Sequence, residues 1–303
     1  MNPDRHALVE TVSRLKHDTG AVILAHNYQA PEIYQVADFI GDSLELARRA
    51  AAADPGIIVF CGVRFMAETA KLLCPRARVI LAEPNAGCRM ADMVTADALA
   101  AKRRELGDVT VVSYVNTPAD VKAESDICCT SANAAAVVGS VPAGRRILFV
   151  PDRNLADWAG REAGREMIAW PGFCYVHAVF TASDVERART QWPQAKVIAH
   201  PECRPEVLAA ADHVASTGGM LRLAAGLEEV VLGTEAGMCA RVNLDHPAVA
   251  CHPLRRTALC ANMKLTSLES VREALFGRVE EIVIPEPVAD RARRAIERML
   301  ELG

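Results

Sequence analysis

The sequence has no apolar run that approaches the length of a membrane-spanning helix, and it has no excess of basic charge. It carries 34 Lys and Arg against 38 Asp and Glu, a net charge of −4, so nothing favours nucleic acid or an anionic membrane as a partner. The first residues also lack the apolar segment of a secretory signal. We therefore expect a cytoplasmic protein with no membrane and no nucleic acid among its partners.

Low-complexity segments and Cys-x-x-Cys pairs are also absent, although the chain has ten cysteines. Without such pairs a structural zinc site is disfavoured, and in a reducing compartment disulfides are rare. Burial, catalysis or metal binding remain. We expect Cys74, beside Pro75, to end a helix. Six others are expected to be buried as small apolar residues, namely Cys61, Cys128, Cys129, Cys203, Cys239 and Cys251.

The other three cysteines are equally spaced. Cys88, Cys174 and Cys260 are separated by 86 residues each time, and each follows an apolar run. A threonine expected to open a helix follows each of them, at Thr95, Thr181 and Thr266. Recurrence at a fixed period indicates a repeated structural unit. Three equivalent units would bring the three thiols together on one axis.

Short apolar runs alternate with helical segments along the whole chain, which predicts βαβ units and parallel sheets. The predicted fold class is α/β, with three similar βαβ-type domains whose short parallel sheets surround a pseudo-threefold axis. We expect the units to span residues 1–105, 106–193 and 194–280. A strand at Ile282–Ile284 and a helix, within 281–303, are expected to pack back on the first unit.

Each unit also repeats a ring-bearing residue, an aspartate and a hydroxyl. The rings end a predicted strand and belong to His26, Tyr114 and His200. The aspartates are Asp38, Asp126 and Asp212, and the hydroxyls five residues later are Ser43, Ser131 and Thr217. Open α/β sheets bind ligands beyond the carboxyl ends of their strands. The repeats therefore predict one cavity that holds three copies of each feature.

Three thiolates make a zinc ion a poor Lewis acid, because they donate charge to it. A 4Fe-4S cluster is held by cysteine thiolates, and with only three of them one iron keeps an open position. Such an iron suits the dehydration of an oxygenated small molecule. Besides a dehydrating enzyme of this kind, including an aconitase-like hydro-lyase on another small acid, an iron–sulfur redox sensor or carrier remains open. Three ordinary core cysteines are the simplest alternative.

Several polar residues suit an anionic substrate. Ser216 and Thr217 precede two glycines at a predicted helix start, a pattern typical of a phosphate or carboxylate cradle and equally of an ordinary helix cap. His177, like His26 and His200, is a candidate acid, base or cation, or else a structural hydrogen-bonding residue.

Three further groups complete the set of candidates. Glu202 is a candidate base, or else a solvated loop carboxylate. Tyr28 and Tyr114 can hydrogen-bond an oxyanion, or pack half-buried. In contrast, the segment Asp152–Asn154 and the pair Arg48–Arg49 are interpreted as surface or inter-unit salt-bridge groups rather than catalysts.

Taken together, the motifs resemble those of the quinolinate synthase family over essentially the whole chain. They are AHNYQ (25–29), GDS (41–43), SYVNT (113–117), CTSAN (129–133), VPDRNLA (150–156), WPGFCYVH (170–177), HPEC (200–203), ASTG (215–218), GTEAGM (233–238) and CANMK (260–264). The resemblance implies three similar α/β domains around a central 4Fe-4S cluster. It also implies condensation of iminoaspartate with dihydroxyacetone phosphate to quinolinate, and a functional link to the L-aspartate oxidase that supplies iminoaspartate.

The resemblance assigns roles by position. Cys88, Cys174 and Cys260 match the cluster ligands, whose open iron would bind a substrate oxygen and help water to leave. The catalytic candidates are Glu202, His200, Tyr28 and His26. The substrate-binding candidates are His26, Ser43, Tyr114, Val115, Asn116, Ser131, His177, His200, Pro201, Glu202, Ser216 and Thr217.

Two positions depart from the family pattern. Arg89 follows the first ligand where relatives often carry proline, and we expect it to alter the surroundings of the cluster but not the ligand. Thr257 stands three residues before Cys260, where some relatives have a cysteine. A local redox switch of the Cys-x-x-Cys kind is therefore not expected here.

Overall fold

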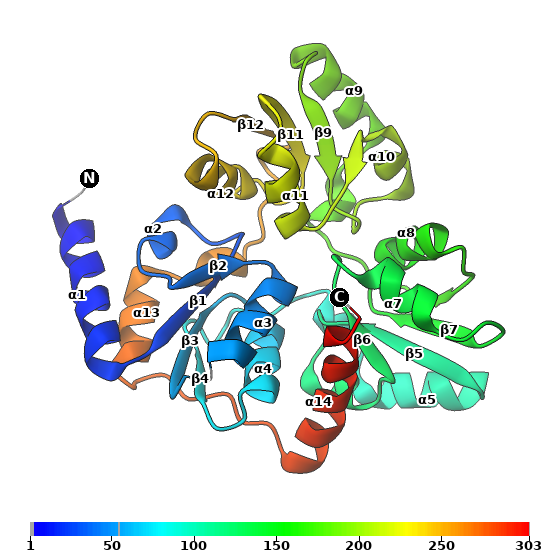
Figure 1. The fold of residues 1–303 in the computed structure, drawn as a ribbon, viewed down its shortest axis with the longest axis horizontal. Coiled ribbons are helices and arrows are strands. Elements are labelled where there is room, and N and C mark those ends of the chain that lie inside the picture. Colours follow the sequence, from blue (N-terminus) through cyan, green and yellow to red (C-terminus); the bar gives the residue numbers. More distant parts are fainter. Residues whose placement is uncertain (1–2, 54, 303) are drawn as a thin grey trace.

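The computed structural model describes residues 3–53 and 55–302, and the strands in this part form three four-stranded sheets in which every pairing is parallel. The first sheet has the order β2-β1-β3-β4, the second β6-β5-β7-β8 and the third β10-β9-β11-β12. Figure 1 shows the three units as separate lobes around a common centre. The predicted fold class of three similar βαβ-type units is confirmed.

The strand bounds follow the apolar runs closely. The strands are Val22–His26 (β1), Phe39–Gly41 (β2), Ile57–Cys61 (β3), Arg78–Leu81 (β4), Val109–Tyr114 (β5), Ile127–Cys129 (β6), Arg146–Val150 (β7), Ile168–Ala169 (β8), Lys196–Ala199 (β9), His213–Val214 (β10), Glu229–Gly233 (β11) and Ala250–Pro253 (β12). The central strands are buried almost throughout because helices cover both faces of a parallel sheet.

The helices alternate with these strands. They are Pro3–Thr19 (α1), Pro31–Tyr34 (α2), Ser43–Ala53 (α3), Arg64–Leu73 (α4), Ala96–Leu106 (α5), Ala119–Ala123 (α6), Ala134–Ser140 (α7), Arg153–Ala163 (α8), Ala182–Gln191 (α9), Pro205–Ala210 (α10), Thr217–Ala224 (α11), Met238–Asp245 (α12), Leu268–Leu275 (α13) and Glu286–Leu300 (α14). Within the described part of the chain, none of the helices combines the length and the apolar character needed to cross a membrane.

The three repeated aspartates fasten each unit in the same way. Each carboxylate accepts the backbone N–H of a residue in the first strand of its unit at 2.8 Å. The pairs are Asp38 with Ile23, Asp126 with Val111 and Asp212 with Val197. Each carboxylate also pairs with a cation from the helix that precedes the first strand of its unit. These cations are Lys16 in α1, Arg103 in α5 and Arg189 in α9. These aspartates are structural clamps that place the following edge strand.

This clamp corrects the prediction for the segment after Pro31. The sequence from Pro31 onward favours a helix that reaches Asp38, but α2 ends at Tyr34 and Asp38 leads into β2. The N–H of Asp38 donates to the carbonyl of Ile23, which draws the chain alongside β1. The equivalent edge strands are also short, with three residues in β6 and two in β10, so their apolar runs gave no signal of their own.

The three cysteine loops are also alike. The carbonyl oxygen of each cysteine accepts the N–H of the residue four positions later, at Asp92, Ala178 and Lys264. Three short 3-10 helices follow at the same 86-residue spacing, at Ala91–Met93 (η1), His177–Val179 (η2) and Met263–Leu265 (η3). Thr95 and Thr181 cap the next helices as predicted, but the third cap is Ser267 and not Thr266. Ser267 is the residue that keeps the 86-residue period.

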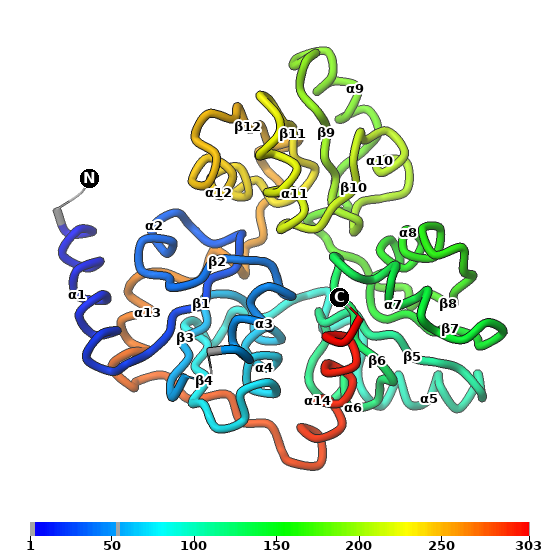
Figure 2. Tube along the Cα trace, viewed as in Figure 1, coloured from blue at the N-terminus to red at the C-terminus, as the bar shows by residue number. Residues whose placement is uncertain are grey.

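The C-terminal tail contacts the first unit, on which the sequence predicted it to pack, and the second unit as well. The N–H of Ile282 donates to the carbonyl of Val79 in β4, but residues 282–284 form no named strand. Helix α14 then lies between the first two lobes, where it packs chiefly on α6 and β6 and also on α4 (Figure 2). The predicted boundaries between units remain predictions, because the sheets locate the units but not the joins between them.

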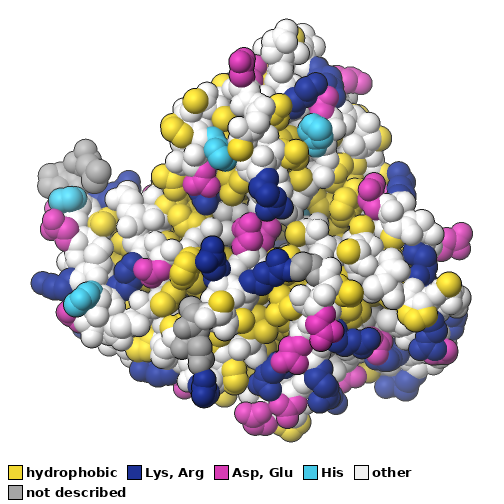
Figure 3. Space-filling view, in the orientation of Figure 1, with side chains coloured by type: hydrophobic (Ala, Val, Ile, Leu, Met, Phe, Trp, Pro, Cys, Tyr) yellow, Lys and Arg dark blue, Asp and Glu magenta, His cyan; other side chains and the backbone are white. Residues whose placement is uncertain are grey.

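The surface carries charges of both signs. On the face shown in Figure 3, basic and acidic side chains are intermingled and no single sign dominates.

Candidate active site

A cavity of about 80 Å³ lies where the three units meet. A volume of this size has room for about two or three water molecules, at about 30 Å³ for each. Its walls come from the ends of β1, β5 and β9 and from the three cysteine loops. The predicted residues that line it are His26, Tyr28, Ser43, Cys88, Tyr114, Asn116, Ser131, Cys174, His177, His200, Glu202, Thr217 and Cys260.

Three of the predicted substrate-binding residues do not line this cavity. Val115 lines a smaller hollow beside Ser43 and Phe65, and Pro201 is buried between its two functional neighbours. Ser216 caps α11, where its hydroxyl accepts the N–H of Gly219 and donates to Asp42. Ser216 therefore fixes the start of α11, where Thr217 lies, and does not line the cavity itself.

His26 and His200 occupy equivalent positions and are held alike. The Nδ1 atom of His26 accepts the N–H of Tyr28 at 3.2 Å, and that of His200 accepts the N–H of Glu202 at 3.3 Å. Burial is the main cause that lowers the pKa of each imidazole to about 3. Both rings are therefore neutral near pH 7, and since Nδ1 accepts, the proton is on Nε2. Each ring offers an uncharged N–H donor.

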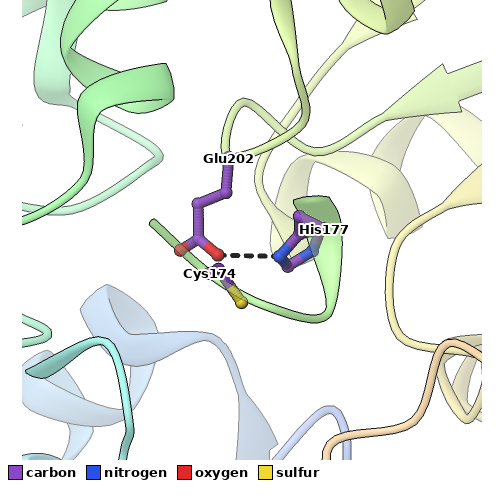
Figure 4. A group of neighbouring side chains, drawn as sticks. All are labelled: Cys174, His177 and Glu202. Carbon is purple, nitrogen blue, oxygen red and sulfur yellow. Dashed lines mark ion pairs between the residues drawn. The ribbon is translucent and has the colours of Figure 1, made fainter. Parts of the chain in front are cut away.

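A chain of buried polar groups crosses the cavity wall. The hydroxyl of Tyr28 lies 2.5 Å from that of Thr234, which lies 2.9 Å from Nε2 of His177. Nδ1 of His177 lies 2.7 Å from Glu202, whose other oxygen accepts the hydroxyl of Tyr114 at 2.7 Å. Figure 4 shows His177 and Glu202 facing each other. The order hydroxyl, imidazole, carboxylate is one that moves protons in many enzymes.

The charges in this chain are set by its surroundings. Burial raises the pKa of Glu202, but the imidazoles of His177 and His200 and the hydrogen bonds from His177 and Tyr114 outweigh it, so the net pKa is lowered. Burial and the charge of Glu202 raise the pKa of Tyr28 and Tyr114 well above the usual value. Glu202 is therefore an ionised acceptor and both phenols keep their protons. The alternative of a solvated loop carboxylate at Glu202 is excluded, because it is buried.

Thr234 is a site residue to which the sequence assigned no role, although it lies in the GTEAGM motif. It follows directly after β11 and is fully buried. The equivalent positions after β3 and β7 are Gly62 and Pro151, which carry no hydroxyl. The repeat therefore gave no signal for it.

The interpretation of Asp152 and Asn154 as surface groups is wrong, because both are buried. The carboxylate of Asp152 caps α8 and accepts the N–H of Cys174 at 3.0 Å. The amide of Asn154 donates to the carbonyl of Glu202 at 3.0 Å. The two side chains thus hold a candidate ligand and a candidate base in place. Glu235, equally buried beyond β11, contacts the loop of Cys260 in a similar way.

The three spaced cysteines meet at the cavity, where all are half-buried free thiols. Their loops are tied together: the side chain of Asn262 donates to the carbonyl of Gly87, and the N–H of Ala261 donates to the hydroxyl of Tyr175. Burial raises the pKa of all three thiols, that of Cys88 to about 12. A metal centre reverses this preference because it deprotonates the thiols that it binds. Three soft donors from separate loops are suited to iron–sulfur chemistry.

A single metal ion fits less well. Two ligands of one zinc ion stand within about 4 Å of each other. Among the described residues, the three spaced sulfurs do not form a triad within 4.8 Å, but Cys174, His177 and Glu202 do, and they are a candidate metal site (Figure 4). However, both ring nitrogens of His177 already face Glu202 and Thr234. An ion at this triad would have to break the contact between His177 and Glu202.

Arg89 covers the cavity on the side of the cysteine loops. Its guanidinium carbon lies 5.2 Å from the ring centre of Tyr175, the residue that follows Cys174. Arg89, Tyr175 and Ala261 each follow one of the three spaced cysteines. Tyr175 contacts the other two, because its ring faces Arg89 and its hydroxyl accepts the N–H of Ala261. Arg89 thus lines the cavity beside the first thiol, and its effect on the surroundings of a cluster stays a prediction.

Comparison with known proteins agrees with this geometry. The family described as Quinolinate synthetase A protein matches residues 10–301. A protein named quinolinate synthase from Desulforudis audaxviator (strain MP104C) is 49% identical over 297 residues, covering 97% of this chain and 98% of its own. One of the same name from Methanoregula boonei (strain DSM 21154 / JCM 14090 / 6A8) is 50% identical over 301 residues, 99% of both chains. Another, from Thermococcus kodakarensis (strain ATCC BAA-918 / JCM 12380 / KOD1), is 45% identical over 302 residues, 99% of this chain and 100% of its own.

Proposed function

The chain belongs to the quinolinate synthetase A family, and on this premise we propose that it condenses iminoaspartate with dihydroxyacetone phosphate to give quinolinate, phosphate and water. The observation that carries the proposal is the cavity in which three thiols, two neutral imidazoles and the chain from Tyr28 to Glu202 meet. We place the reaction in the cytoplasm, where thiols stay reduced.

Both substrates are anionic, and the cavity offers them uncharged donors. The Nε2–H groups of His26 and His200 are free to donate to carboxylate, carbonyl or phosphate oxygens. The hydroxyls of Ser43, Ser131 and Thr217 and the amide of Asn116 line the same space. Thr217 opens α11, whose N-terminus favours an anion. These donors would orient the two substrates for bond formation.

The condensation requires protons to be taken from carbon and delivered to leaving oxygen atoms. The hydroxyl of Tyr28 faces the cavity and leads through Thr234 to Nε2 of His177. Nδ1 of His177 is beside the ionised Glu202, which stabilises the imidazolium that forms when the ring takes a proton. Tyr28 and this pair would therefore act as one proton-transferring unit, and Tyr114 would keep Glu202 oriented.

Cys88, Cys174 and Cys260 would hold a 4Fe-4S cluster. When bound, a cluster with only three cysteine ligands supplies a Lewis-acidic iron with an open position, which suits the removal of a hydroxyl group as water. Asp152 and Glu235 would support the second and third ligand loops through the backbone of Cys174 and of Cys260.

The proposal is tested by product analysis under anaerobic conditions. L-aspartate oxidase and aspartate would generate iminoaspartate in the same vessel, because the imine is unstable and must be used as it forms. With dihydroxyacetone phosphate, the wild type and Cys61→Ala should both form quinolinate, since Cys61 lies outside the cavity. Cys174→Ala should form none. Dehydration of other hydroxy acids without quinolinate would favour a hydro-lyase and overturn the proposal.

A further inference from the structure

Asn27 is a buried polar residue to which the sequence and the proposed reaction assign no role. It follows β1 and has no exposed surface. Its side-chain amide nitrogen donates to the hydroxyl of Thr217 at 3.0 Å, and its side-chain oxygen accepts Nε–H of Arg241 at 3.3 Å. Its backbone groups are fixed as well, by the carbonyl of Gly41 and the hydroxyl of Tyr34.

We propose that Asn27, held by Arg241, is a positioning residue that directs the hydroxyl proton of Thr217 into the cavity, toward an anionic oxygen of the substrate. The inference rests on the proposed function, because it takes Thr217 as a substrate contact. It extends that function to two residues outside the cavity lining.

The direction of each hydrogen bond carries the argument. Arg241 can only donate, so the oxygen of the Asn27 amide must face it and the NH₂ group must face Thr217. The hydroxyl oxygen of Thr217 then accepts, and its own proton remains free. Thr217 lines the cavity, so this proton can be donated to a ligand there. Arg241 is itself buried and paired with Asp245, which fixes the whole arrangement on α12.

The sharpest test is Asn27→Asp, which keeps the shape and the contact with Arg241 but replaces the donor by an acceptor. The hydroxyl of Thr217 would then donate to Asp and be lost to the substrate. A hydrogen bond to a charged group contributes about 10- to 150-fold in affinity. We therefore expect KM for one of the two substrates to rise by about that factor, with a smaller change in kcat.

A double-mutant cycle separates positioning from the added negative charge. Thr217→Val removes the hydroxyl at constant shape, and in that background Asn27→Asp should add little to KM. Equal effects of Asn27→Asp with and without the hydroxyl would overturn the proposal, since the charge alone would explain them. A Thr217→Val variant with wild-type KM would also overturn it. Quinolinate formed by that variant would leave the proposed function standing, so the two failures are distinguishable.

A separate observation points to a modification site between Cys239 and Cys251. Their sulfur atoms lie 2.7 Å apart, one on α12 and the other on β12, and neither lines the cavity. Contrary to the prediction of full burial, Cys251 is half-buried and so reachable from solvent. We infer that this pair forms a reversible disulfide on exposure to a peroxide.

The step balances with one molecule of hydrogen peroxide. The thiol of Cys251 gives up its proton to water as its sulfur attacks one peroxide oxygen, the O–O bond breaks, and a sulfenic acid and hydroxide form. The sulfur of Cys239 then displaces the sulfenic hydroxyl, and the S–S bond forms. Two thiols lose two electrons and two protons, and the peroxide is reduced to two molecules of water. Contact of the two sulfurs beforehand makes the second displacement fast relative to attack by an external thiol.

Peptide mapping tests this site. The cluster-loaded protein would be treated with one equivalent of hydrogen peroxide, alkylated, and digested with trypsin without reductant, while its visible absorption is followed. The tryptic peptides 223–241 and 242–255 should appear joined, and should separate on addition of dithiothreitol. Cys251→Ser should abolish the joined species. Separate peptides after treatment, or a bond from Cys239 or Cys251 to a different cysteine, would overturn the inference.

Discussion

Thr234 stands between the two groups that move protons in the proposed reaction. Its hydroxyl touches both the phenol of Tyr28 and the imidazole of His177, and it has no exposed surface. A hydroxyl in this position can accept a proton from one neighbour while it donates to the other. Neither valine nor alanine can do this. The residue is thus the most informative single position in the proton-transferring unit.

We predict that Thr234→Val lowers kcat for quinolinate formation by about 100-fold or more, the usual contribution of a positioned acid or base. Valine keeps the volume of threonine, so the iron content should change little, but two buried groups lose a partner and the free energy of unfolding should fall by about 1–3 kcal/mol. Thr234→Ser restores the hydroxyl and should restore most of kcat. Steady-state kinetics of the three proteins measure the effect. A Thr234→Val variant with wild-type kcat would contradict the role of this hydroxyl.

The two buried imidazoles predict an acid-sensitive fold. Burial lowers the pKa of His26 and His200 to about 3, so between about pH 6.5 and 3 the unfolded chain binds more protons than the folded one. The free energy of unfolding is therefore unaffected by these two groups above about pH 6.5, and it decreases as the pH falls below that value. Each can remove up to about 1.4 kcal/mol of unfolding free energy per pH unit.

Urea unfolding of cluster-free protein at neutral pH and near about pH 5 measures this loss. Glutamine is polar and close in size to histidine, but it cannot take up a proton. The free energy of unfolding of His200→Gln should therefore fall less steeply than that of the wild type as the pH is lowered. Parallel slopes for the two proteins would show that His200 is already protonated or exposed in the folded state.

At the scale of elements, the repeated aspartate clamp explains why three edge strands form from so few residues. β2, β6 and β10 are too short to be stable by pairing alone. In each unit the aspartate at the start of the edge segment binds the neighbouring strand through its carboxylate and its own N–H. The carboxylate takes the place of one backbone carbonyl in the hydrogen bonding between the two strands. The hydroxyl five residues later is thereby carried to the cavity.

We predict that Asp212→Ala lowers the free energy of unfolding by about 1–3 kcal/mol, because the N–H of Val197 loses its acceptor. Partial burial acts to raise the pKa of Asp212, but the backbone N–H of Val197 and the side chain of Arg189 outweigh it and hold the pKa below its usual value. The stabilisation is therefore present above the unfolded pKa near 4 and is lost as the pH falls through the folded pKa. Glu162→Ala, on an exposed face of α8, is the matched control. An equal loss in both variants, by urea titration, would count against the clamp.

The sequence predicted these elements unevenly, and for physical reasons. The repeat located the three thiols and the strand-end rings, and threonines marked two of the three helix caps, because each depends on a local turn that every unit repeats. Thr234 and Asn154 have no counterpart in the other units and Asp152 has one only in Glu235, so only the folded chain revealed their burial and partners. The end of α2 was missed because a long-range bond at Asp38 overrides the local helical pattern.

At the scale of the whole molecule, the cavity exists only while the three units stay together. Bonds between loops link them near the cavity, and α14 fills the gap between the first two (Figure 1). Its buried face carries Ala289, Ala292, Ile296 and Met299, while charged residues cover the other face. The tail is therefore part of the support of the site, although no residue of it lines the cavity.

We predict that Ile296→Ala lowers the free energy of unfolding by about 2–5 kcal/mol, the usual effect of truncating a fully buried isoleucine. Glu297→Ala, one position further along the same helix and exposed, should be close to neutral. Thermal and urea unfolding of both variants measure the difference. If both were neutral, α14 would not be fastened between the two units in solution.

The central claim is that three equivalent loops, 86 residues apart, deliver three thiolates to one cluster. The most direct test is iron and sulfide analysis with low-temperature spectroscopy on anaerobically prepared protein. The wild type and Cys61→Ala should each hold about four irons per chain as a 4Fe-4S centre. Single alanine variants of Cys88, Cys174 and Cys260 should each lose it while they keep the circular dichroism of the fold. A full cluster in any one of these three variants would contradict the account.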